Sequence, residues 1–380
     1  MPKQAITILS NFNEPIRGVS SYSDKLFKAL QNDNRITLDN CDYKAAYPLA
    51  ESANDTITPA ALHYLKPWTW FKLVKVTSNL LHIQYWTQFQ AYYLYFIVKK
   101  RRCLNAKTII TIHNPLPHES LWPLSFFEYY LFKSCDHLIV HNIEGKEVLL
   151  RLLGESCPDI TIIPHGIDNE SEVSVSHKLV PSSSYLLFAG NIRPYKGLDN
   201  LLDAWAIYDR ESNENMQLII AGKLWGDPKK GFNVFHKLLG MSRYARKILQ
   251  KLEMANNVIS YLNFIPEDEF NGLIQKADMI VLPYKHFHSE SGIVSKALGF
   301  NISILVSRVV GLKRYASSED YIIADTAALP FAKQLRYLIE SSSNDASDLV
   351  KSHVRNASWD RVADAHINVY EKVSNIGEYQ

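Results

Sequence analysis

The sequence predicts an α/β protein with two doubly wound domains. Short runs rich in isoleucine, valine and leucine alternate with longer amphipathic stretches along the 380 residues. Continuous apolar strands that alternate with helical patterns are typical of parallel sheets covered by helices on both faces. The chain length corresponds to about two domains of roughly 100–200 residues each. The apolar runs also fall into two series, so we expect one sheet in each half.

The first half contains six predicted strands. They are Ala5–Leu9, Ile36–Leu38, Leu80–Tyr85, Thr108–Ile112, Leu138–Val140 and Ile160–Ile163. The first strand is followed in the sequence by a polar loop and then by Gly18. After Gly18, apolar residues recur every three or four positions from Val19 to Leu30, as in an amphipathic helix. A strand that leads through a glycine into a helix directs the free amides of the helix start at a ligand above the sheet.

The second half repeats this pattern. Its predicted strands are Tyr185–Ala189, Gln217–Ala221, Val258–Leu262, Met279–Leu282, Ile302–Val306 and Tyr321–Ala324. Polar, turn-rich residues follow Ile167, and they place the division between domains 1–170 and 171–357. Residues 358–380 form a C-terminal segment in which Ser358–Val373 predicts an amphipathic helix that packs on the body of the protein.

Composition excludes several classes of protein. The formal net charge of +2 is too balanced for a chain that coats nucleic acid. The four cysteines form no CxxC pair, which argues against a disulfide framework or a thiolate zinc site and favours a reducing compartment. The sequence shows neither a signal peptide nor an apolar run of about 20 residues that could span a bilayer. We therefore expect a cytoplasmic protein that binds no nucleic acid.

The segment from Gly190 to Leu198 is the most informative one. Arg193 and Lys196 lie in a turn that follows a strand and precedes a helix. Two cations and the first amides of a helix can hold a diphosphate by charge-assisted hydrogen bonds. The alternative is a solvated basic turn, but the strand–turn–helix context favours the phosphate interpretation.

A second glycine-bearing turn follows the predicted strand Met279–Leu282. Ser291 and Gly292 can begin a helix whose unpaired amides bind phosphate oxygens or hydroxyls. His286 and His288 precede this turn, but no further residues at metal-ligand spacing accompany them. We expect no metal site.

His113 ends a buried strand of the first half, at the carboxyl edge where α/β sheets bind ligands. It could face a ligand, or it could be a structural histidine bonded to a backbone carbonyl. His137 and His141 flank another strand and are interpreted as structural. No P-loop, G-x-G-x-x-G or G-x-S-x-G motif is present, which argues against P-loop hydrolysis, nicotinamide binding and the α/β-hydrolase fold.

Four segments together resemble glycosyltransferase family 4, a retaining group with the GT-B architecture. They are Gly190–Leu198 (GNIRPYKGL), Ile163–Ile167 (IPHGI), Thr111–Asn114 (TIHN) and Ser291–Leu298 (SGIVSKAL). The resemblance implies two Rossmann-like domains that face each other across a cleft, with the nucleotide-sugar donor on the second and the acceptor on the first. It also implies a C-terminal helix that returns to the first domain, and no metal or other cofactor.

The resemblance also implies roles for individual residues. Arg193 and Lys196 would neutralise the donor diphosphate and stabilise it as the leaving group, and His113 would lie beside the transferred sugar. Glu290 stands where the first glutamate of a two-glutamate signature is expected, and it completes the candidate catalytic set. The candidate donor-binding residues are Gly18, Val19, Gly190, Asn191, Phe264, Ile265, Ser291, Gly292, Ile293 and Lys296.

Two positions depart from the family pattern. Asn191 stands where many relatives have an arginine directly after the glycine. Lys296 stands where the second glutamate, which binds the donor ribose, is expected. These departures leave a catalytically silent nucleotide-sugar-binding protein as the main alternative. A hexosyl phosphorylase or an epimerase on the same architecture is a third interpretation.

We expect a retaining hexosyltransferase that moves a hexose from a UDP- or GDP-sugar to a hydroxyl of a glycan acceptor. The resemblance suggests a lipid-linked acceptor in surface polysaccharide synthesis. Lys66–Lys72 mixes aromatic and basic residues, and Ala91–Arg102 joins an apolar stretch to four cations. This composition is compatible with peripheral attachment to the inner membrane face, or equally with a core helix that has a solvated basic end.

Overall fold

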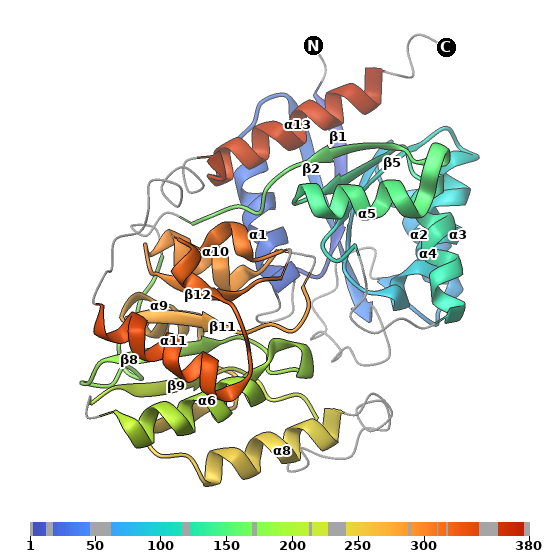
Figure 1. Cartoon of the computed structure of the whole chain (residues 1–380). Coiled ribbons are helices and arrows are strands. Elements are labelled where there is room, and N and C mark those ends of the chain that lie inside the picture. Colours follow the sequence, from blue (N-terminus) through green and yellow to red (C-terminus); the bar gives the residue numbers. More distant parts are fainter. Residues whose placement is uncertain are drawn as a thin grey trace. The chain divides into compact units, whose positions relative to one another are not determined.

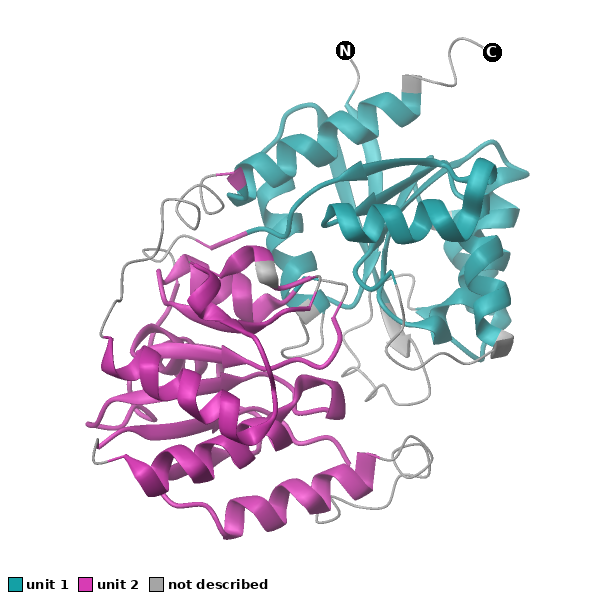
Figure 2. Ribbon diagram, viewed as in Figure 1, with its two compact units in different colours: residues 1–166, 288–290, 357–380 teal, residues 167–287, 291–356 magenta. Residues whose placement is uncertain are grey.

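The computed structural model describes residues 3–12, 18–45, 62–115, 122–168, 173–212, 215–226, 241–287, 290–309, 311–316, 318–341 and 356–375. The chain divides into two compact units (Figure 2). The first unit contains Met1–Gly166, His288–Glu290 and Ala357–Gln380, and the second contains Ile167–Phe287 and Ser291–Asn356. The division that the sequence predicts, between residues 170 and 171, lies outside the described residues, and the units change at Gly166 and Ile167.

The first unit is built on a seven-stranded parallel sheet with the order β3-β2-β1-β4-β5-β6-β7. Strands β1, β2 and β5 of this sheet are labelled in Figure 1. Its strands are β1 (Gln4–Ser10), β2 (Ile36–Ala45), β3 (Leu62–His63), β4 (Leu80–Tyr85), β5 (Lys107–Ile112), β6 (His137–Val140) and β7 (Asp159–Ile162). Its helices are α1 (Gly18–Gln31), α2 (Pro67–Val76), α3 (Ala91–Arg102), α4 (Trp122–Ser134), α5 (Ile143–Leu153) and α13 (Trp359–Asn375), with short 3-10 turns at Gln88–Gln90 and Gly154–Ser156.

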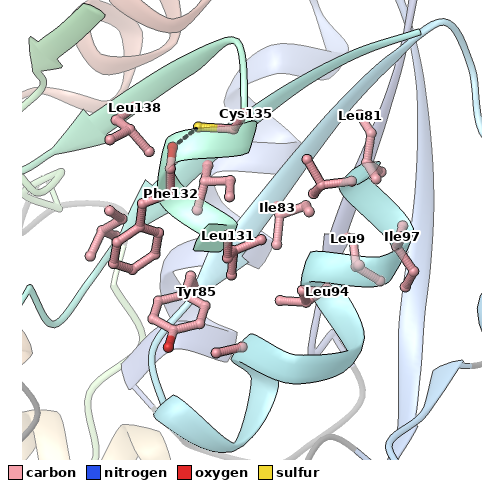
Figure 3. Packing of buried hydrophobic residues seen from close by; sticks show 14 of the residues in the cluster. Leu9, Leu81, Ile83, Tyr85, Leu94, Ile97, Leu131, Phe132, Cys135 and Leu138 are labelled. Carbon is pink, nitrogen blue, oxygen red and sulfur yellow. Dashed lines mark hydrogen bonds between the residues drawn. The ribbon is translucent and has the colours of Figure 1, made fainter. Parts of the chain in front are cut away.

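Each face of this sheet has its own apolar core, because successive strand residues point to opposite faces. On one face Leu81, Ile83 and Tyr85 of β4 pack against α3 and α4 (Figure 3). On the other face Ile6 and Ile8 of β1 pack with residues of α1 and α13. The helices therefore cover both sides of the sheet, as the apolar strand pattern predicts.

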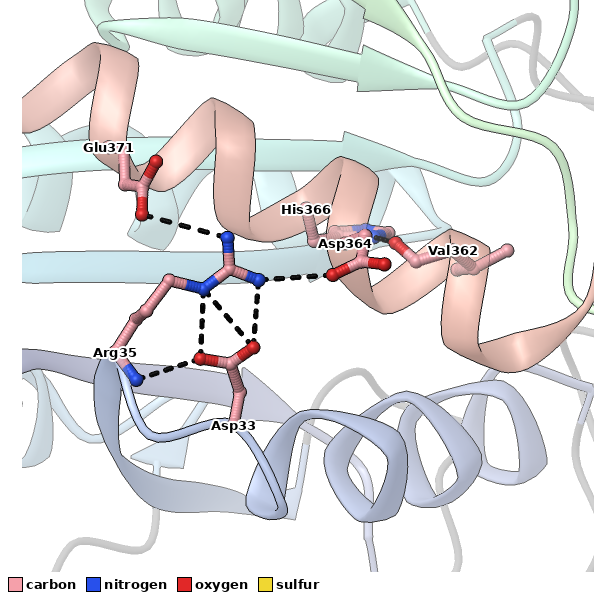
Figure 4. A network of polar contacts seen from close by, with 6 residues as sticks. All are labelled: Asp33, Arg35, Val362, Asp364, His366 and Glu371. Atoms are coloured by element: carbon pink, nitrogen blue, oxygen red, sulfur yellow. Dashed lines mark hydrogen bonds and ion pairs between the residues drawn. The ribbon is translucent and has the colours of Figure 1, made fainter.

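The C-terminal helix α13 belongs to the first unit. Its apolar side, which includes Ile367 and Tyr370, is buried in the core beside α1. At its surface Arg35 forms ion pairs with Asp364 and Glu371 of the helix and with Asp33 near its own position (Figure 4). The expected return of this helix to the first domain is confirmed.

The second unit contains a six-stranded parallel sheet with the order β10-β9-β8-β11-β12-β13. Its strands are β8 (Tyr185–Ala189), β9 (Gln217–Ala221), β10 (Val258–Tyr261), β11 (Met279–Leu282), β12 (Ile304–Ser307) and β13 (Ile322–Ile323). Its helices are α6 (Leu198–Glu211), α8 (Met241–Glu253), α9 (Glu267–Gln275), α10 (Gly292–Gly299) and α11 (Ala328–Glu340), with 3-10 turns at Pro194–Lys196, Lys313–Tyr315 and Glu319–Tyr321.

The sequence-based prediction of the sheets is confirmed, and every predicted strand overlaps an observed one. The two-residue strand β3 was missed because it is too short to form an apolar run. In both sheets the strand order reverses beside the first strand of the unit, at β1 next to β4 and at β8 next to β11. Ligands of α/β sheets bind at the carboxyl ends of the strands at such switch points.

Each of the described helices is too short or too polar to span a lipid bilayer.

Candidate anion site of the second unit

The loop after β8 and the segment after β11 meet at the switch point of the second sheet. Gly197, which precedes α6, has φ = 70°, and a Cβ atom there would lie 2.0 Å from the carbonyl oxygen of Pro283. Only glycine fits this close approach in a left-handed conformation. The amide of Lys285 also donates a hydrogen bond to the carbonyl oxygen of Tyr195 at 2.7 Å. The two segments therefore hold each other in place.

Lys196 is buried in this loop, with 7% of its surface exposed. Its Nζ lies 5.0 Å from the centre of the Tyr284 ring and is close to the backbone of Gly190, where a Cβ atom would be 2.9 Å away. Burial lowers the pKa of the Lys196 ammonium, and the charge of Arg193 acts in the same direction. Within the described residues no carboxylate forms an ion pair with Lys196.

Arg193 lies beside this lysine and also rests on an aromatic ring. Its guanidinium carbon is 4.0 Å from the centre of the Trp225 ring. Asp199, in the first turn of α6, is occupied by two other lysines, since its carboxylate bonds to Lys247 and Lys285 at 2.9 Å each. Aromatic faces attract cations but do not neutralise them. The pair of cations therefore lacks a compensating anion in the described part of the protein.

The start of α10 faces the same region. Ile293 is close to Gly190, whose added Cβ atom would meet Ile293 Cγ1 at 3.2 Å. A Cβ atom added to Gly292 would meet no atom of the described residues within 4 Å apart from its chain neighbours and its own helix backbone, so these residues leave room beside this glycine. Ser291 occupies the N-cap position and makes no side-chain capping bond. The amides of the first turn are the donors that a helix leaves unpaired.

The amino group of Lys296 is already hydrogen-bonded within the protein. Its Nζ donates to Glu267 Oε1 at 2.8 Å and to Asn271 Oδ1 at 2.9 Å. A carboxylate from α9 therefore lies next to the lysine that stands where the resemblance predicts a second glutamate. Phe264 and Ile265 lie between β10 and α9, and Phe264 is 55% exposed while Ile265 is buried.

In the first unit, His113 and Glu290 line the same small concavity at the carboxyl ends of β5 and β6. Glu290 accepts a hydrogen bond from Asn142 Nδ2 at 3.1 Å, and Asn142 also caps α5 by accepting the amide of Gly145. Both ring nitrogens of His113 are hydrogen-bonded, Nε2 to Gln84 at 2.7 Å and Nδ1 to His141 at 3.0 Å. The backbone carbonyl is therefore the group of His113 that could still accept a ligand hydroxyl.

Three further predicted site residues, Gly18, Val19 and Asn191, lie at a helix start or in a loop. Gly18 and Val19 begin α1, where the Val19 carbonyl accepts the hydroxyl of Ser23. Asn191 is exposed in the loop after β8. His288 lies outside the described residues. Among the residues that are described, no group of three or more histidine, cysteine, aspartate or glutamate side chains could hold a metal ion.

Sequence reasoning did not identify the aromatic supports of the two cations or the partners of His113. Trp225 and Tyr284 each follow the end of a predicted strand, as the basic loop does, and this shared position at the carboxyl edge of the sheet was the available signal. Gln84 alternates with the apolar residues of β4, and His141 was interpreted as structural. Linking either to His113 requires the register of three strands, which the sequence does not reveal.

Comparison with solved structures identifies the class of fold. A sucrose-phosphate synthase from Thermosynechococcus elongatus is similar with a TM-score of 0.71 and 16% identity, over 98% of this chain and 100% of that structure. The Anabaena protein HepE in complex with UDP and glucose is similar with a TM-score of 0.69 and 12% identity, over 97% of this chain and 100% of that structure. The fold is GT-B, as the sequence predicts.

Sequence comparison finds a family match within the second unit. Residues 170–354 match the family described as glycosyl transferases group 1. The D-inositol 3-phosphate glycosyltransferase of Pseudarthrobacter chlorophenolicus is 24% identical over 256 residues, which are 64% of this chain and 57% of that relative. This chain thus spans little more than half the length of the curated relative that it matches.

Proposed function

We propose that the protein is a glycosyltransferase that binds the diphosphate of a nucleotide sugar at Arg193 and Lys196. One observation carries the proposal: a buried ammonium and a neighbouring guanidinium share a switch point without a carboxylate partner in the described part of the chain. A buried charge that is unpaired is costly, so such a site favours an anionic ligand. The family match over residues 170–354 supports a sugar-diphosphate donor as that ligand.

The transfer that we propose proceeds with retention and moves a hexose from a UDP- or GDP-sugar. The bond between the anomeric carbon and the diphosphate oxygen breaks while the two cations and the first amides of α10 stabilise the negative charge of the leaving group. The acceptor hydroxyl oxygen bonds to the same face of the anomeric carbon. Its proton passes to an oxygen of the departing diphosphate, so no protein nucleophile takes part.

For the acceptor we propose a lipid-linked glycan of surface polysaccharide synthesis, reached from the inner membrane face. Support comes from an exposed surface on α2, α3 and α4, three helices that pack side by side in the first unit (Figure 1). We call it the aromatic surface; it comprises Trp68, Phe71, Phe96, Phe126 and Tyr130. Trp68 is 67% exposed and Phe126 59%.

Basic side chains accompany the aromatic surface. They are Lys66, Lys72, Lys75, Lys99, Lys100, Arg102 and Lys133, all exposed. Lys99 lies over the ring of Tyr95 and Lys133 over the ring of Tyr129, each at 5.8 Å. The single carboxylate of these three described helices, Glu128, is buried and accepts hydrogen bonds from Tyr85 and Gln88. Exposed aromatic rings with lysines and without exposed acids fit an anionic membrane interface.

Donor binding and transfer are tested together with the Lys196→Ala variant. In the unsubstituted protein, a UDP-, GDP- or ADP-sugar at 100 times its dissociation constant should stabilise the fold by about 2.7 kcal/mol, which a thermal-shift assay detects. Lys196→Ala should lower the turnover number about 100-fold or more, since it removes one positioned donor to the developing charge. Lys247→Ala is the matched control, because that lysine is partly exposed and pairs with Asp199 in the same unit.

Normal turnover in Lys196→Ala would refute the assignment of this residue. The silent-binding alternative is motivated by Lys296, whose amino group is taken by Glu267 and Asn271. A thermal shift with a nucleotide sugar, but neither transfer nor hydrolysis of it in the purified protein, would establish that alternative.

A further inference from the structure

A line of polar side chains crosses the first sheet on the face that α1 and α13 cover. The line consists of Tyr370, His82, Gln84, Thr111, His113 and His141, and we call it the polar line. His82 and Gln84 point to this face because they alternate along β4 with the apolar residues of the opposite core. Strand register then sets Gln84 opposite Thr111 on β5.

The polar line is continuous from α13 to the end of β7. Tyr370 Oη lies 2.8 Å from His82 Nδ1, and His82 Nε2 lies 2.7 Å from Thr111 Oγ1 and 3.2 Å from the Gln84 amide. The other atom of that amide is 2.7 Å from His113 Nε2. His113 Nδ1 is 3.0 Å from His141 Nε2, and His141 Nδ1 is 2.9 Å from the carbonyl oxygen of Ile163.

The carbonyl oxygen of Ile163 determines which group donates and which accepts in each hydrogen bond of the polar line. A carbonyl oxygen can only accept, so His141 donates to Ile163 through Nδ1–H. A neutral His141 then accepts through Nε2, so His113 donates through its own Nδ1–H and must accept through Nε2. The group next to His113 Nε2 must therefore be a donor, which in Gln84 is the amide NH2.

Gln84 is placed with its Oε1 toward His113. The two orientations of a glutamine amide have the same shape, and the hydrogen-bond network decides between them. With Oε1 toward His113, one of the two imidazoles would have to carry a second proton. The polar line contains no carboxylate to balance that charge, and burial lowers the pKa of His113 well below its ordinary value. The opposite orientation gives each of these contacts one donor and one acceptor while all three histidines stay neutral.

We propose that Gln84 is a positioning residue that holds His113 as the neutral Nδ1–H tautomer by donating its amide NH2 to Nε2. His82 then donates through Nε2–H to Thr111 and to the Gln84 oxygen, and it accepts from the hydroxyl of Tyr370. The ring of Tyr22 packs against His113 and His141, with ring centres 4.8 and 5.2 Å apart, and restricts their orientation. A fully satisfied buried network is rigid.

The consequence for the site is that the His113 ring supplies neither a base nor an acid. Both of its nitrogens are occupied, and the ring instead fixes the position of the backbone carbonyl at the end of β5. The effect of this fixation on turnover rests on the proposed transferase function, whereas the tautomer itself does not.

The tautomer is measured on the full-length protein without ligand. In protein labelled with ¹⁵N in its histidines, long-range ¹H–¹⁵N correlation spectra near neutral pH distinguish Nδ1–H, Nε2–H and doubly protonated rings. We expect neutral Nδ1–H rings for His113 and His141 and a neutral Nε2–H ring for His82. A His113 ring that carries its proton on Nε2, or two protons, overturns the proposal whether or not the protein transfers sugar.

The Gln84→Leu variant tests the positioning role. It removes the donor to His113 and the acceptor from His82, so the His113 signals should lose the defined Nδ1–H pattern. Turnover per folded molecule should fall about 10- to 100-fold, the scale of a small misplacement of reacting groups. His137→Gln is the matched control, because this histidine begins β6 and bonds to Thr161 outside the polar line. An unchanged His113 tautomer in Gln84→Leu would also overturn the proposal.

Discussion

Lys196 and Lys296 show how the partner of a lysine decides its chemistry. Lys296 bonds to a carboxylate and an amide oxygen, so its charge is already balanced. Lys196 is buried, and its amino group lies beside the Tyr284 ring and next to Gly190. The charge of Lys196 is not balanced within the described residues. The binding free energy of an anion should therefore be more favourable at Lys196 than at Lys296.

Single buried histidines give the fold a pH dependence. His366 of α13 is fully buried, and its burial lowers the pKa to about 4 despite a hydrogen bond to the Val362 carbonyl. The rings of His82 and Tyr370 lie near it, with ring centres at 5.5 and 6.2 Å. Since the folded-state pKa is lowered, the unfolded chain takes up the proton first. The contribution of His366 to stability is complete above pH 6.5 and is lost as the pH falls toward about 4.

We therefore predict that the free energy of unfolding falls between pH 6.5 and about 4, with a contribution of about 3 kcal/mol from His366. Urea denaturation at several pH values measures this slope. His366→Leu should make the slope shallower, while the same substitution at the exposed His177 should leave it as it is. A slope that His366→Leu does not change would contradict the prediction.

At the scale of elements, the C-terminal helix is held by apolar packing more than by its ion pairs. Arg35 reaches three carboxylates (Figure 4), but it is exposed, and exposed pairs contribute little to stability. Ile367 of the same helix is 1% exposed and lies in the core with Tyr22 and Leu26.

We predict that Ile367→Ala lowers the free energy of unfolding by about 2–5 kcal/mol, the usual cost of a cavity in a core. Arg35→Ala should cause no measurable change in the same denaturation experiment. The reverse order of effects would show that the ion pairs, and not the core, hold α13 on the first unit.

The strands and the basic loop could be predicted because their signals are contiguous in the sequence. An apolar run, a glycine and two cations within twelve residues identify the loop after β8. The polar line could not be predicted, since Gln84, His113 and His141 come from three segments. Their meeting depends on strand order and register, which only long-range pairing determines.

At the scale of the whole molecule, the aromatic surface predicts how the protein distributes between water and membranes. We expect flotation with vesicles that contain phosphatidylglycerol, weaker flotation with phosphatidylcholine alone, and a loss of binding at high salt. Replacing Lys99 and Lys133 by glutamine should reduce binding about 30-fold, at about 1 kcal/mol for each charge.

The matched control for this experiment is Tyr337→Ser, which removes an exposed aromatic residue from α11 in the second unit. Equal flotation with neutral and anionic vesicles, or an effect of Tyr337→Ser as large as that of the two lysine changes, would argue against the aromatic surface as the membrane contact.

The first unit is discontinuous along the chain, and this has a consequence for its biosynthesis. A ribosome releases residues 1–166 long before residues 357–380, with the entire second unit between them. Until α13 is translated, apolar side chains beside α1 lack their covering partner and Tyr370 is absent from the polar line. Synthesis of the second unit is therefore complete before synthesis of the first. A premature stop codon ahead of Trp359 should yield an aggregation-prone polypeptide that engages chaperones.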